Sequence, residues 1–399
     1  MNSRALVGVD EYLNRVLESL TVGEKSRLSL DDCLGSALAD TVISTIPLPP
    51  FANSSMDGYA LRTADVQQVP VELAVSADIP AGSASPSLLT PRTAARIMTG
   101  APLPAGADAV IPVEWTDAGT HRVVINQQVS LGAHVRDRGD DLPEGSVLAE
   151  AGDEVDAARI GLMASSGIAE CQVYRRPRVA IFATGDELVE PGVPLNSGHI
   201  YDSNTHLMRA LVSADARVGV VGTLPDDPTV AATRLVEVAR QSELLITMGG
   251  ISAGAYEPIK QAFTARGGVD FCSVAMQPGK PQGCGFLGST PLLALPGNPL
   301  SSLVSFEVFV RPALRVLGGF AEIHRPEAHL QLLTAQPRRS DRVRFLPAVA
   351  DLSAGTVVTA DRHGSHRSST AAGANCLIEL PMGSQDAGAG ELVTVRLLS

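Results

Sequence analysis

The spacing of apolar and polar positions divides the chain into regions with different secondary structure. Near the N-terminus, apolar residues between positions 12 and 20 recur at helical spacing, which predicts an amphipathic helix. A second, shorter helix is expected over residues 30–39. The proline-rich segment 46–51 (IPLPPF) then predicts a stiff, extended connection to the next region.

Two regions show the short apolar runs and frequent turns that are typical of β structure. Residues 53–134 contain such runs between glycine- and proline-rich turns, and they predict a small, mostly β domain. Beyond residue 318, further short runs at regular spacing predict a small barrel or sandwich. Residues 135–173 hold glycine-rich turns and one short helix, and we expect them to pack back against the N-terminal helices.

Residues 178–317 carry the clearest pattern, in which apolar strands alternate with helices. Such alternation favours a mostly parallel sheet that is covered by helices on both faces. The expected strands are residues 178–184, 217–223, 243–248, 269–274 and 292–295. The expected helices are residues 229–242, 258–266 and 299–317, together with one that ends at Leu211 and is capped by Asp202 or Ser203.

The expected fold class is therefore a multidomain α/β plus β protein. Its three-layer α/β domain, with a mostly parallel sheet, is expected at residues 177–318. A C-terminal β-barrel-like domain is expected at residues 319–399, and a small mostly β domain at residues 51–134. A discontinuous, helical N-terminal linking domain, residues 1–50 with 135–176, is expected to join these parts.

Composition narrows the possible functions. The 399 residues are 45% hydrophobic and carry a formal net charge of −12 without a cluster of Lys and Arg, so no nucleic-acid partner is expected. The five cysteines form no CxxC pair, which argues against a structural zinc site. No apolar run reaches the roughly 18 residues of a membrane span. The N-terminus lacks the apolar core of a signal peptide, so we expect a cytoplasmic protein without a membrane partner.

Candidate chemistry gathers where the expected parallel strands end. In open parallel sheets, ligands bind beyond the carboxyl ends of the strands. Here those ends carry glycines, carboxylates and helix starts, at residues 185–187, 226–227, 249–254 and 296–299. The convergence of these segments is more specific than any one of them.

Two of these segments could bind an anion through backbone N–H groups. The turn that contains Gly250, Ser252 and Gly254 allows close approach of the backbone, or it is an ordinary strand-to-helix turn. The second segment and the helix start after it supply Pro296, Gly297, Asn298 and Ser301. A helix start favours an anion by roughly 0.3–1 kcal/mol, and simple capping is the alternative here.

Carboxylates near the same strand ends suit an oxygen-ligated cation such as Mg²⁺. The candidate ligands are Asp186, Glu187, Asp227 and Glu257. Asp227 precedes a helix, so N-capping is its alternative role. Lys280 is held between Pro278-Gly279 and Pro281, and it is either a fixed cation for an oxyanion or a solvated loop lysine.

Four further candidates lie in weaker contexts. Asp57 lies at the glycine-bearing turn of SSMDGYA and Thr99 lies in MTG, where each is either functional or only a turn former. Arg344 and Ser365 of the C-terminal region either contact an anion or lie at a solvated strand edge.

Several motifs, in the same order, resemble those of the molybdopterin molybdenumtransferases, the bacterial counterparts of the gephyrin E domain. They are PPFANSSMDGYAL, RIMTGAPLPAGADAVIPVE, ATGDELVEPG, IYDSN, GGISAGAYEPIK, PGKPQG and LPGNPLSS. They span about residues 46–302, and GSH with NCLIEL extends the resemblance into the C-terminal domain. Each motif is moderately specific, whereas their joint order is highly specific.

The resemblance implies an enzyme that inserts molybdenum from molybdate into adenylylated molybdopterin and releases AMP, the last common step of molybdenum cofactor biosynthesis. It implies Mg²⁺ as cofactor and an elongated homodimer, with the active site between the α/β domain and the β domain of the other subunit. The molybdopterin adenylyltransferase is a further candidate partner. The implied functional positions are Asp57, Thr99, Asp141, Glu187, Asp227, Lys280, Arg344 and Ser365, with Asp140 as the alternative to Asp141.

Two positions depart from the family pattern. Glu257 stands where Asp is usual, and a ligand carboxylate displaced by about an ångström can cost roughly 10²-fold in rate. Gln277 stands where some members have a second lysine, so one anion contact is absent. We expect Glu257 still to support metal-dependent turnover.

Two other functions are compatible with part of the sequence. The α/β domain resembles the fold that adenylylates molybdopterin, which would make the chain a nucleotidyltransferase that uses ATP. Gephyrin's related domain also anchors receptors by binding a peptide, which would make the chain an interaction protein. The multidomain frame and the MDGYA segment favour molybdenum insertion, and no added scaffold region is visible.

Overall fold

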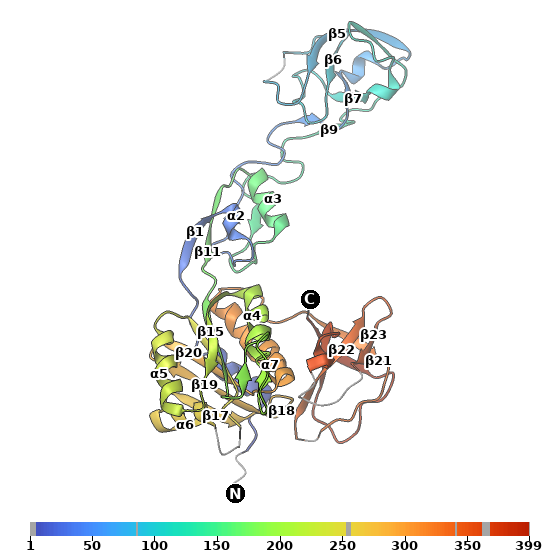
Figure 1. Cartoon of the computed structure of the whole chain (residues 1–399). Coiled ribbons are helices and arrows are strands. Elements are labelled where there is room, and N and C mark those ends of the chain that lie inside the picture. Colours follow the sequence, from blue (N-terminus) through green and yellow to red (C-terminus); the bar gives the residue numbers. More distant parts are fainter. Residues whose placement is uncertain (1–4, 85–86, 253–256, 340, 361–367, 399) are drawn as a thin grey trace.

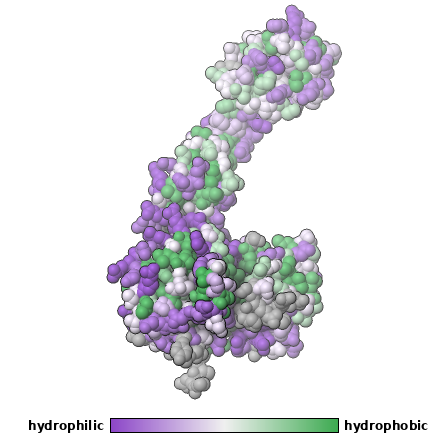
Figure 2. Space-filling view, viewed as in Figure 1, coloured by the Kyte–Doolittle hydropathy of each residue, from purple (hydrophilic) through white to green (hydrophobic). Residues whose placement is uncertain are grey.

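The computed structural model describes residues 5–84, 87–252, 257–339, 341–360 and 368–398, which form an elongated molecule (Figure 1). A small β domain lies at one end and a linking domain in the middle. The α/β domain and the C-terminal β domain lie side by side at the other end. In the space-filling view of Figure 2, the linking domain is a narrow neck between the two ends.

The linking domain is built from two segments that are far apart in the sequence. Its strands are β1 (Lys25–Ser29), β2 (Val42–Ile43), β10 (Val147–Ala149) and β11 (Glu170–Tyr174), and its helices are α2 (Leu30–Cys33) and α3 (Ala157–Ser165). Strand β1 pairs with β11 and β10 pairs with β2, both antiparallel. Residues 135–173 were expected to pack against the N-terminal helices, and a shared apolar core between α2 and α3 confirms this for the second of those helices.

The length expected for the second N-terminal helix is wrong. The helix was expected over residues 30–39, but α2 ends at Cys33. Gly35 takes a left-handed φ of +71°, which stops the helix, and Leu38 then forms a β-bridge with Val173.

The small domain at the far end is mostly β, as expected. Its strands are β4 (Gly58–Leu61), β5 (Val71–Ile79), β6 (Thr93–Ile97), β7 (Ala109–Pro112) and β8 (Arg122–Ile125), in the spatial order β7-β4-β6-β5-β8. Successive residues of β4 enter different cores, with Tyr59 in one and Ala60 in the other, so apolar side chains cover both faces of the sheet.

The α/β domain contains a six-stranded sheet in the order β15-β12-β16-β20-β19-β17. Its strands are β12 (Arg178–Thr184), β15 (Arg217–Leu224), β16 (Leu244–Met248), β17 (Val269–Ser273), β19 (Pro281–Leu287) and β20 (Thr290–Leu295). Only β19 runs opposite to the other five strands, so the sheet is mostly parallel, as expected. Strand β19 was not expected, because Gly283 and Gly285 interrupt its apolar pattern.

Helices cover both faces of this sheet, which confirms the three layers. One face carries α1 (Val9–Leu17), α4 (Asn204–Asp215), α7 (Pro299–Ser305) and α8 (Arg311–Leu317), and the other carries α5 (Pro228–Ala239) and α6 (Pro258–Arg266). The helix expected over residues 299–317 contains a π-helical segment, Phe306–Val310. Helix α1 was placed in the linking domain by the sequence, but its Tyr12 packs on Phe309, with ring centroids 4.8 Å apart.

The C-terminal domain is a closed five-stranded barrel. Its strands are β21 (Glu327–Leu332), β22 (Val343–Asp351), β23 (Thr356–Thr359), β24 (Cys376–Leu380) and β25 (Leu392–Leu397). The pairings run from β22 through β23, β21, β25 and β24 back to β22, which closes the ring. A short strand of the preceding domain, β18 (Met276–Gln277), adds to β22 in parallel.

A buried ion-pair network joins α4, α8 and the linking domain. Asp215 contacts Arg315 Nη1 at 2.8 Å and Arg311 Nε at 3.3 Å, and all three side chains are buried. Arg315 Nη1 also lies 3.1 Å from Glu154 of the linking domain. Because two cations share one buried carboxylate, loss of that carboxylate leaves Arg311 without its ion-pair partner and Arg315 with only the half-exposed Glu154.

We expect Asp215→Asn to lower the free energy of unfolding by about 3 kcal/mol or more, because Arg311 and Arg315 lose their buried counter-ion. Urea unfolding followed by circular dichroism measures the loss. Glu154→Gln is the matched control, since its carboxylate is half exposed and should contribute less than about 1 kcal/mol. Equal losses for the two variants would contradict this account of the network.

Candidate active site

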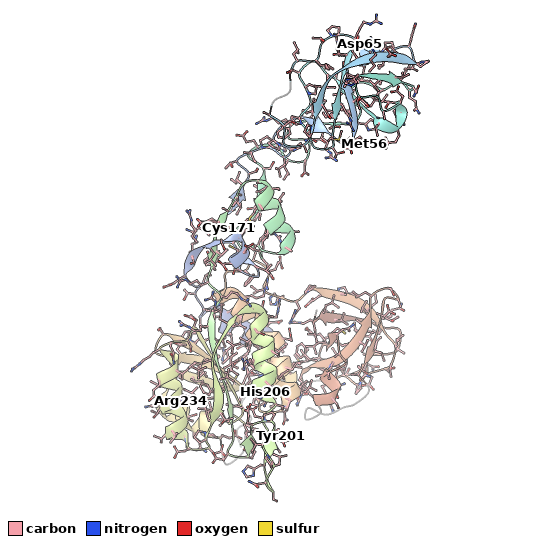
Figure 3. The ribbon with its side chains drawn as sticks, turned by 45° about the horizontal axis from the view of Figure 1, so that its top comes forward. Met56, Asp65, Cys171, Tyr201, His206 and Arg234 are labelled. Atoms are coloured by element: carbon pink, nitrogen blue, oxygen red, sulfur yellow. The ribbon has the colours of Figure 1, made fainter. Side chains whose placement is uncertain are left out.

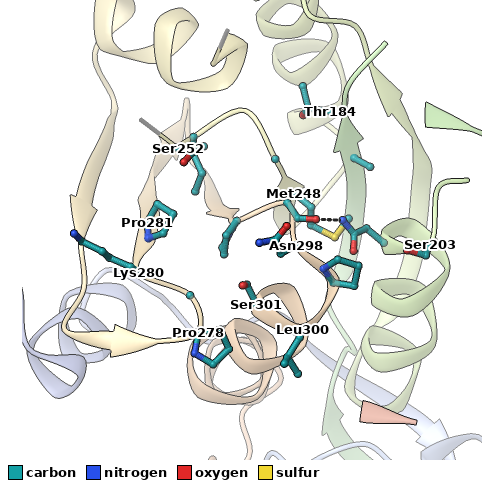
Figure 4. Close-up of a pocket in the computed structure, with 18 of the residues that line it drawn as sticks. Thr184, Ser203, Met248, Ser252, Pro278, Lys280, Pro281, Asn298, Leu300 and Ser301 are labelled. Carbon is teal, nitrogen blue, oxygen red and sulfur yellow. Dashed lines mark hydrogen bonds between the residues drawn. The ribbon is translucent and has the colours of Figure 1, made fainter. Parts of the chain in front are cut away.

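A cavity of about 900 Å³ opens at the carboxyl ends of β12, β16 and β20. Its walls come from the turns after these strands, the turn between β18 and β19, and the barrel strand β22. Figure 4 shows Ser252, Asn298, Ser301 and Lys280 around it. The residues expected from the sequence that line it are Glu187, Gly250, Ser252, Glu257, Lys280, Pro296, Gly297, Asn298, Ser301 and Arg344.

The turns after β16 and β20 approach each other so closely that a side chain would force one of them to shift. A Cβ on Gly297 would lie 3.2 Å from the Cα of Gly249, and a Cβ on Gly249 would lie 3.1 Å from Thr184 O. Gly250 has a left-handed φ of +69°, and its Cβ would lie 3.1 Å from Ile259 Cγ1. The glycines that allow a ligand to approach the backbone are therefore also needed for packing.

A rigid turn before β19 holds Lys280 at the rim of the cavity. The buried Gln282 side chain donates from Nε2 to Gly279 O and to Ser305 Oγ, both at 2.7 Å. Lys280 O accepts a hydrogen bond from Val274 N at 2.7 Å. The backbone around Lys280 is therefore fixed, while its side chain is exposed.

The C-terminal barrel contributes a second cation, Arg344. The pairing of β18 with β22 sets Gln277 beside Arg344. Arg344 is buried, its Nη1 donates to Pro337 O, and its Nε has no hydrogen-bond partner among the described residues. Burial and, to a smaller extent, the charge of Arg339 lower the pKa of Arg344. A lysine at position 277 would lie beside this arginine, so Gln277 avoids a like-charge contact.

Glu257 holds the glycine turn after β16 in place. Its Oε2 accepts a hydrogen bond from Ser252 N at 2.7 Å, and Lys260 Nζ donates to Ser252 O at 3.2 Å. Glu257 is only 9% exposed. Its carboxylate is therefore already used to fix the turn that lines the cavity.

The structure does not bring the four expected metal ligands into one group. Asp227 Oδ1 accepts from Thr229 N at 2.8 Å and from Val230 N at 3.0 Å, so Asp227 is the N-cap of α5. Asp186 Oδ1 accepts from Asp226 N at 3.3 Å. Over the described part of the chain, no three His, Cys, Asp or Glu side chains are arranged to hold a metal ion.

The exposed carboxylates that line the cavity are Glu187 and Asp226. The Glu187 carboxylate lies over Gly185, where a Cβ would come within 2.2 Å of Glu187 Oε2. Mg²⁺ usually keeps several waters and is held by one or two carboxylates together with the phosphates of a substrate. This donor set fits Mg²⁺ that binds with a phosphorylated substrate, and it does not form a cage from protein oxygens alone.

At the far end of the molecule, the structure brings Asp57 and Thr99 together. The antiparallel pairing of β4 with β6 sets Gly58 opposite Ile97, so the residues just beyond this pair are neighbours. Asp57 Oδ1 accepts from Thr99 N at 2.7 Å and from Thr99 Oγ1 at 2.8 Å. These hydrogen bonds, the backbone one first, lower the pKa of Asp57.

Within one chain, this pair does not reach the cavity. Met56, next to Asp57, and Tyr201, which lines the cavity, lie at opposite ends of the molecule in Figure 3. Asp140 and Asp141 are exposed. They lie in the connection between the linking and small β domains, where Asp141 N donates to the backbone oxygen of residue 48 at 2.9 Å.

Two of the expected site residues, Gly254 and Ser365, lie outside the described residues. The sequence prediction of the site also missed Asn204, whose Nδ2 donates to Gly297 O at 2.6 Å. Its buried Oδ1 has no hydrogen-bond partner in the described part of the chain. The IYDSN motif held the available signal, because Asp202 accepts from Thr205 N at 3.0 Å and so starts α4 at the cavity edge.

Family models match almost the whole chain. The "MoeA N-terminal region (domain I and II)" matches residues 7–167, a "Probable molybdopterin binding domain" matches residues 180–316, and the "MoeA C-terminal region (domain IV)" matches residues 329–398. The "Molybdopterin molybdenumtransferase 2" of Mycobacterium tuberculosis is 42% identical over 97% of this chain and 98% of its own length. The chain belongs to the molybdopterin molybdenumtransferase family.

Other similar proteins match along the full length. The molybdopterin molybdenumtransferase of Haemophilus influenzae is 33% identical over 98% of this chain and 98% of its own length. Two solved molybdopterin biosynthesis proteins from Pyrococcus horikoshii have TM-scores of 0.83 at 24% identity and 0.80 at 28% identity, and each match covers at least 98% of both chains. As a member of the molybdopterin molybdenumtransferase family, this chain is an enzyme of molybdenum cofactor biosynthesis. Among the described helices, none combines the length and hydropathy that a membrane crossing requires.

We expect Thr99→Val to raise the pKa of Asp57 part of the way to its ordinary value, because the hydroxyl donor is lost while the Thr99 N–H remains. An NMR titration of the Asp57 carboxyl carbon measures the change. Thr99→Ser keeps the hydroxyl and is the matched control.

The sign of the linked stability effect follows from the lowered pKa of Asp57. Its contribution is present above the unfolded pKa of about 3.9 and is lost as the pH falls through the lower folded value. Thr99→Val should therefore weaken the acid dependence of stability that Asp57 causes. An Asp57 pKa that is the same in Thr99→Val and in the native chain would show that the hydroxyl does not matter.

Proposed function

We propose that this chain inserts molybdenum from molybdate into adenylylated molybdopterin and releases AMP, the last common step of molybdenum cofactor biosynthesis. The proposal is carried by the mixed charge of one cavity at the carboxyl edge of the α/β sheet. Three cations, Lys280, Arg342 and Arg344, line that cavity, and Arg342 is paired with Asp341. Two exposed carboxylates, Glu187 and Asp226, line it as well. A phosphorylated anion and a divalent cation each have complementary charge there.

The size and polar groups of the cavity suit a pterin joined to a nucleotide. Its volume of about 900 Å³ lies near the top of the usual range for small-molecule sites. Lys280 at the rim supplies a charged donor for molybdate or a phosphate. Asn204 Oδ1 can accept a hydrogen bond from the substrate, and Arg344 Nε can donate one. Neither atom has a hydrogen-bond partner in the described chain.

The cavity fits Mg²⁺ as cofactor. Glu187 and Asp226 would be its protein ligands, and phosphate oxygens of the substrate would complete the coordination of the ion. The ion supplies positive charge that stabilises the departing phosphate group. The residues of the chain bind and orient the substrate around it. Lys280 contributes a positive charge on a side chain that starts from a fixed backbone. Glu257 keeps the Ser252 turn in the position that shapes the cavity.

We infer that the Asp57–Thr99 pair acts at the cavity of a second copy of the chain, in a homodimer. Within one chain, the linking domain holds the pair away from the cavity. A two-fold arrangement of elongated chains can set each small β domain beside the other subunit's α/β domain. Asp57, together with Asp141 from the adjacent connection, then adds negative charge near the cation site. The molybdopterin adenylyltransferase, which makes the adenylylated substrate, is the partner that this function implies.

No observation favours either alternative function. Adenylylation with ATP would need only the α/β domain, whereas this chain matches its relatives in every region. A peptide-anchoring role would not explain the charged residues that line the cavity.

We expect the purified chain to release AMP from adenylylated molybdopterin when molybdate and Mg²⁺ are present, and to form a cofactor that activates a molybdenum-free molybdoenzyme. Lys280→Gln should lower kcat/KM by about 10²-fold, because a charged donor to an oxyanion is lost. Lys25→Gln is the matched control, since Lys25 pairs with Asp40 in the linking domain. Production of adenylylated molybdopterin from ATP, without its consumption, would overturn the proposed function.

We expect two impaired variants to restore activity when their chains are mixed. Asp57→Asn changes the small β domain and Lys280→Gln changes the cavity, so a mixed dimer keeps one intact site. After dissociation and random reassociation at equal amounts, turnover should reach about one quarter of the native value, because half of the dimers are mixed and each has one good site of two.

The control for this mixing experiment pairs Lys280→Gln with Glu187→Gln. Both changes lie in the same cavity, so every site of a mixed dimer is damaged and no activity should return. If Asp57→Asn and Lys280→Gln also fail to restore activity, the Asp57–Thr99 pair does not act on the cavity of a second chain.

A further inference from the structure

A second cavity, of about 680 Å³, lies at the opposite edge of the α/β sheet, where the strands begin. It lies beside the two connections between the linking domain and the α/β domain. Residues 19–24 of the first connection and 175–178 of the second both form part of its wall. It shares no lining residue with the proposed substrate cavity.

Positive charge exceeds negative charge in this second cavity. Its charged lining residues are Arg175, Arg176, Arg178, Arg217, Glu24 and Glu243. Arg178 pairs with Glu243 at 3.2 Å and Arg175 pairs with Glu24 at 3.5 Å. Two arginines are left after these pairs, and in a chain with a net charge of −12 this local excess favours an anion.

The two other arginines have no carboxylate partner among the described residues. Arg176 donates from Nη2 to Ser213 O at 2.8 Å and to Ala214 O at 2.6 Å, while its buried Nε has no hydrogen-bond partner there. The Arg217 side chain forms no hydrogen bond or ion pair with any described residue. The parallel register sets Arg178 directly beside Arg217, and because Arg178 is paired with Glu243, Arg217 carries the charge that an anion there would balance.

We propose that this second cavity binds a phosphorylated small molecule, with its phosphate between Arg176 and Arg217. Guanidinium groups match phosphate oxygens in a two-pronged geometry. Leu20, Phe286 and Pro291 give the same cavity an apolar wall for an organic group. This site is independent of the proposed molybdenum transfer, because none of its residues belongs to the substrate cavity.

Occupation of the site restrains the linking domain. Arg176 lies in the second connection, whereas Arg217 is the first residue of β15 in the α/β domain. A phosphate held by both arginines would add to the backbone hydrogen bond that already joins this connection to β15, from Arg217 N to Pro177 O at 2.8 Å. Hydrogen exchange in the two connections should therefore slow when the ligand binds.

Isothermal titration of the full chain with pyrophosphate and, separately, with ADP tests the proposal. We expect Arg217→Gln to weaken binding by about tenfold or more, because a charged donor to the phosphate is lost. Arg217→Lys keeps the charge and should lose less. Arg234→Gln, an exposed position on α5 (Figure 3), is the matched control and should bind as the native chain does.

Hydrogen–deuterium exchange locates the bound anion. With pyrophosphate, protection should appear in residues 19–24 and 175–178 of the native chain and be absent in Arg217→Gln. Tighter binding of ADP than of pyrophosphate identifies a nucleotide as the ligand, whereas equal affinity identifies the inorganic anion. Equal binding by Arg217→Gln and the native chain, or protection only around the substrate cavity, overturns the proposal.

Discussion

The close contact between the two glycine turns after β16 and β20 shapes the cavity at the carboxyl edge of the α/β sheet. A Cβ on Gly297 would lie 3.2 Å from the Cα of Gly249, so any larger residue at position 297 must push the turns apart. Asn204 donates to Gly297 O at 2.6 Å and ties the same contact to the start of α4. Strands β12, β16 and β20 run parallel and end together, so the turns that follow them meet at this contact.

A second constraint brings cations to this edge from outside the parallel strands. Strand β18 leaves the α/β domain to pair with β22 of the barrel, and this pairing sets Gln277 beside Arg344. The turn that follows carries Lys280 and is fastened to α7 by the two hydrogen bonds of Gln282. The barrel thus contributes to the cavity itself and is more than an attached domain. Without it, the cavity would lack Arg344, the buried arginine among its lining residues.

The parts of this fold that periodicity predicts are those in which each element buries its own apolar face. Strand β19 escaped prediction because Gly283 and Gly285 lie where β17 packs too closely for a side chain, which removes the apolar alternation. At the site, the meeting of the strand-end motifs follows from parallel topology alone. The roles of Asp227 and Glu257 do not follow from topology. Asp227 caps α5 and Glu257 accepts a hydrogen bond from Ser252 N, and these hydrogen bonds form only after folding. Carboxylate spacing in the sequence therefore could not predict that Asp227 and Glu257 are already engaged by backbone N–H groups.

Metal binding and chain association become linked if the Asp57–Thr99 pair completes the cavity of a second subunit. The hydrogen bonds from Thr99 lower the pKa of Asp57, so its exposed carboxylate is charged at neutral pH. Bringing this charge toward Glu187 and Asp226 costs free energy unless a cation lies among them. Under the proposed arrangement, Mg²⁺ therefore strengthens the association of the small β domain with the cavity. By the reciprocity of coupled equilibria, that association strengthens Mg²⁺ binding by the same factor.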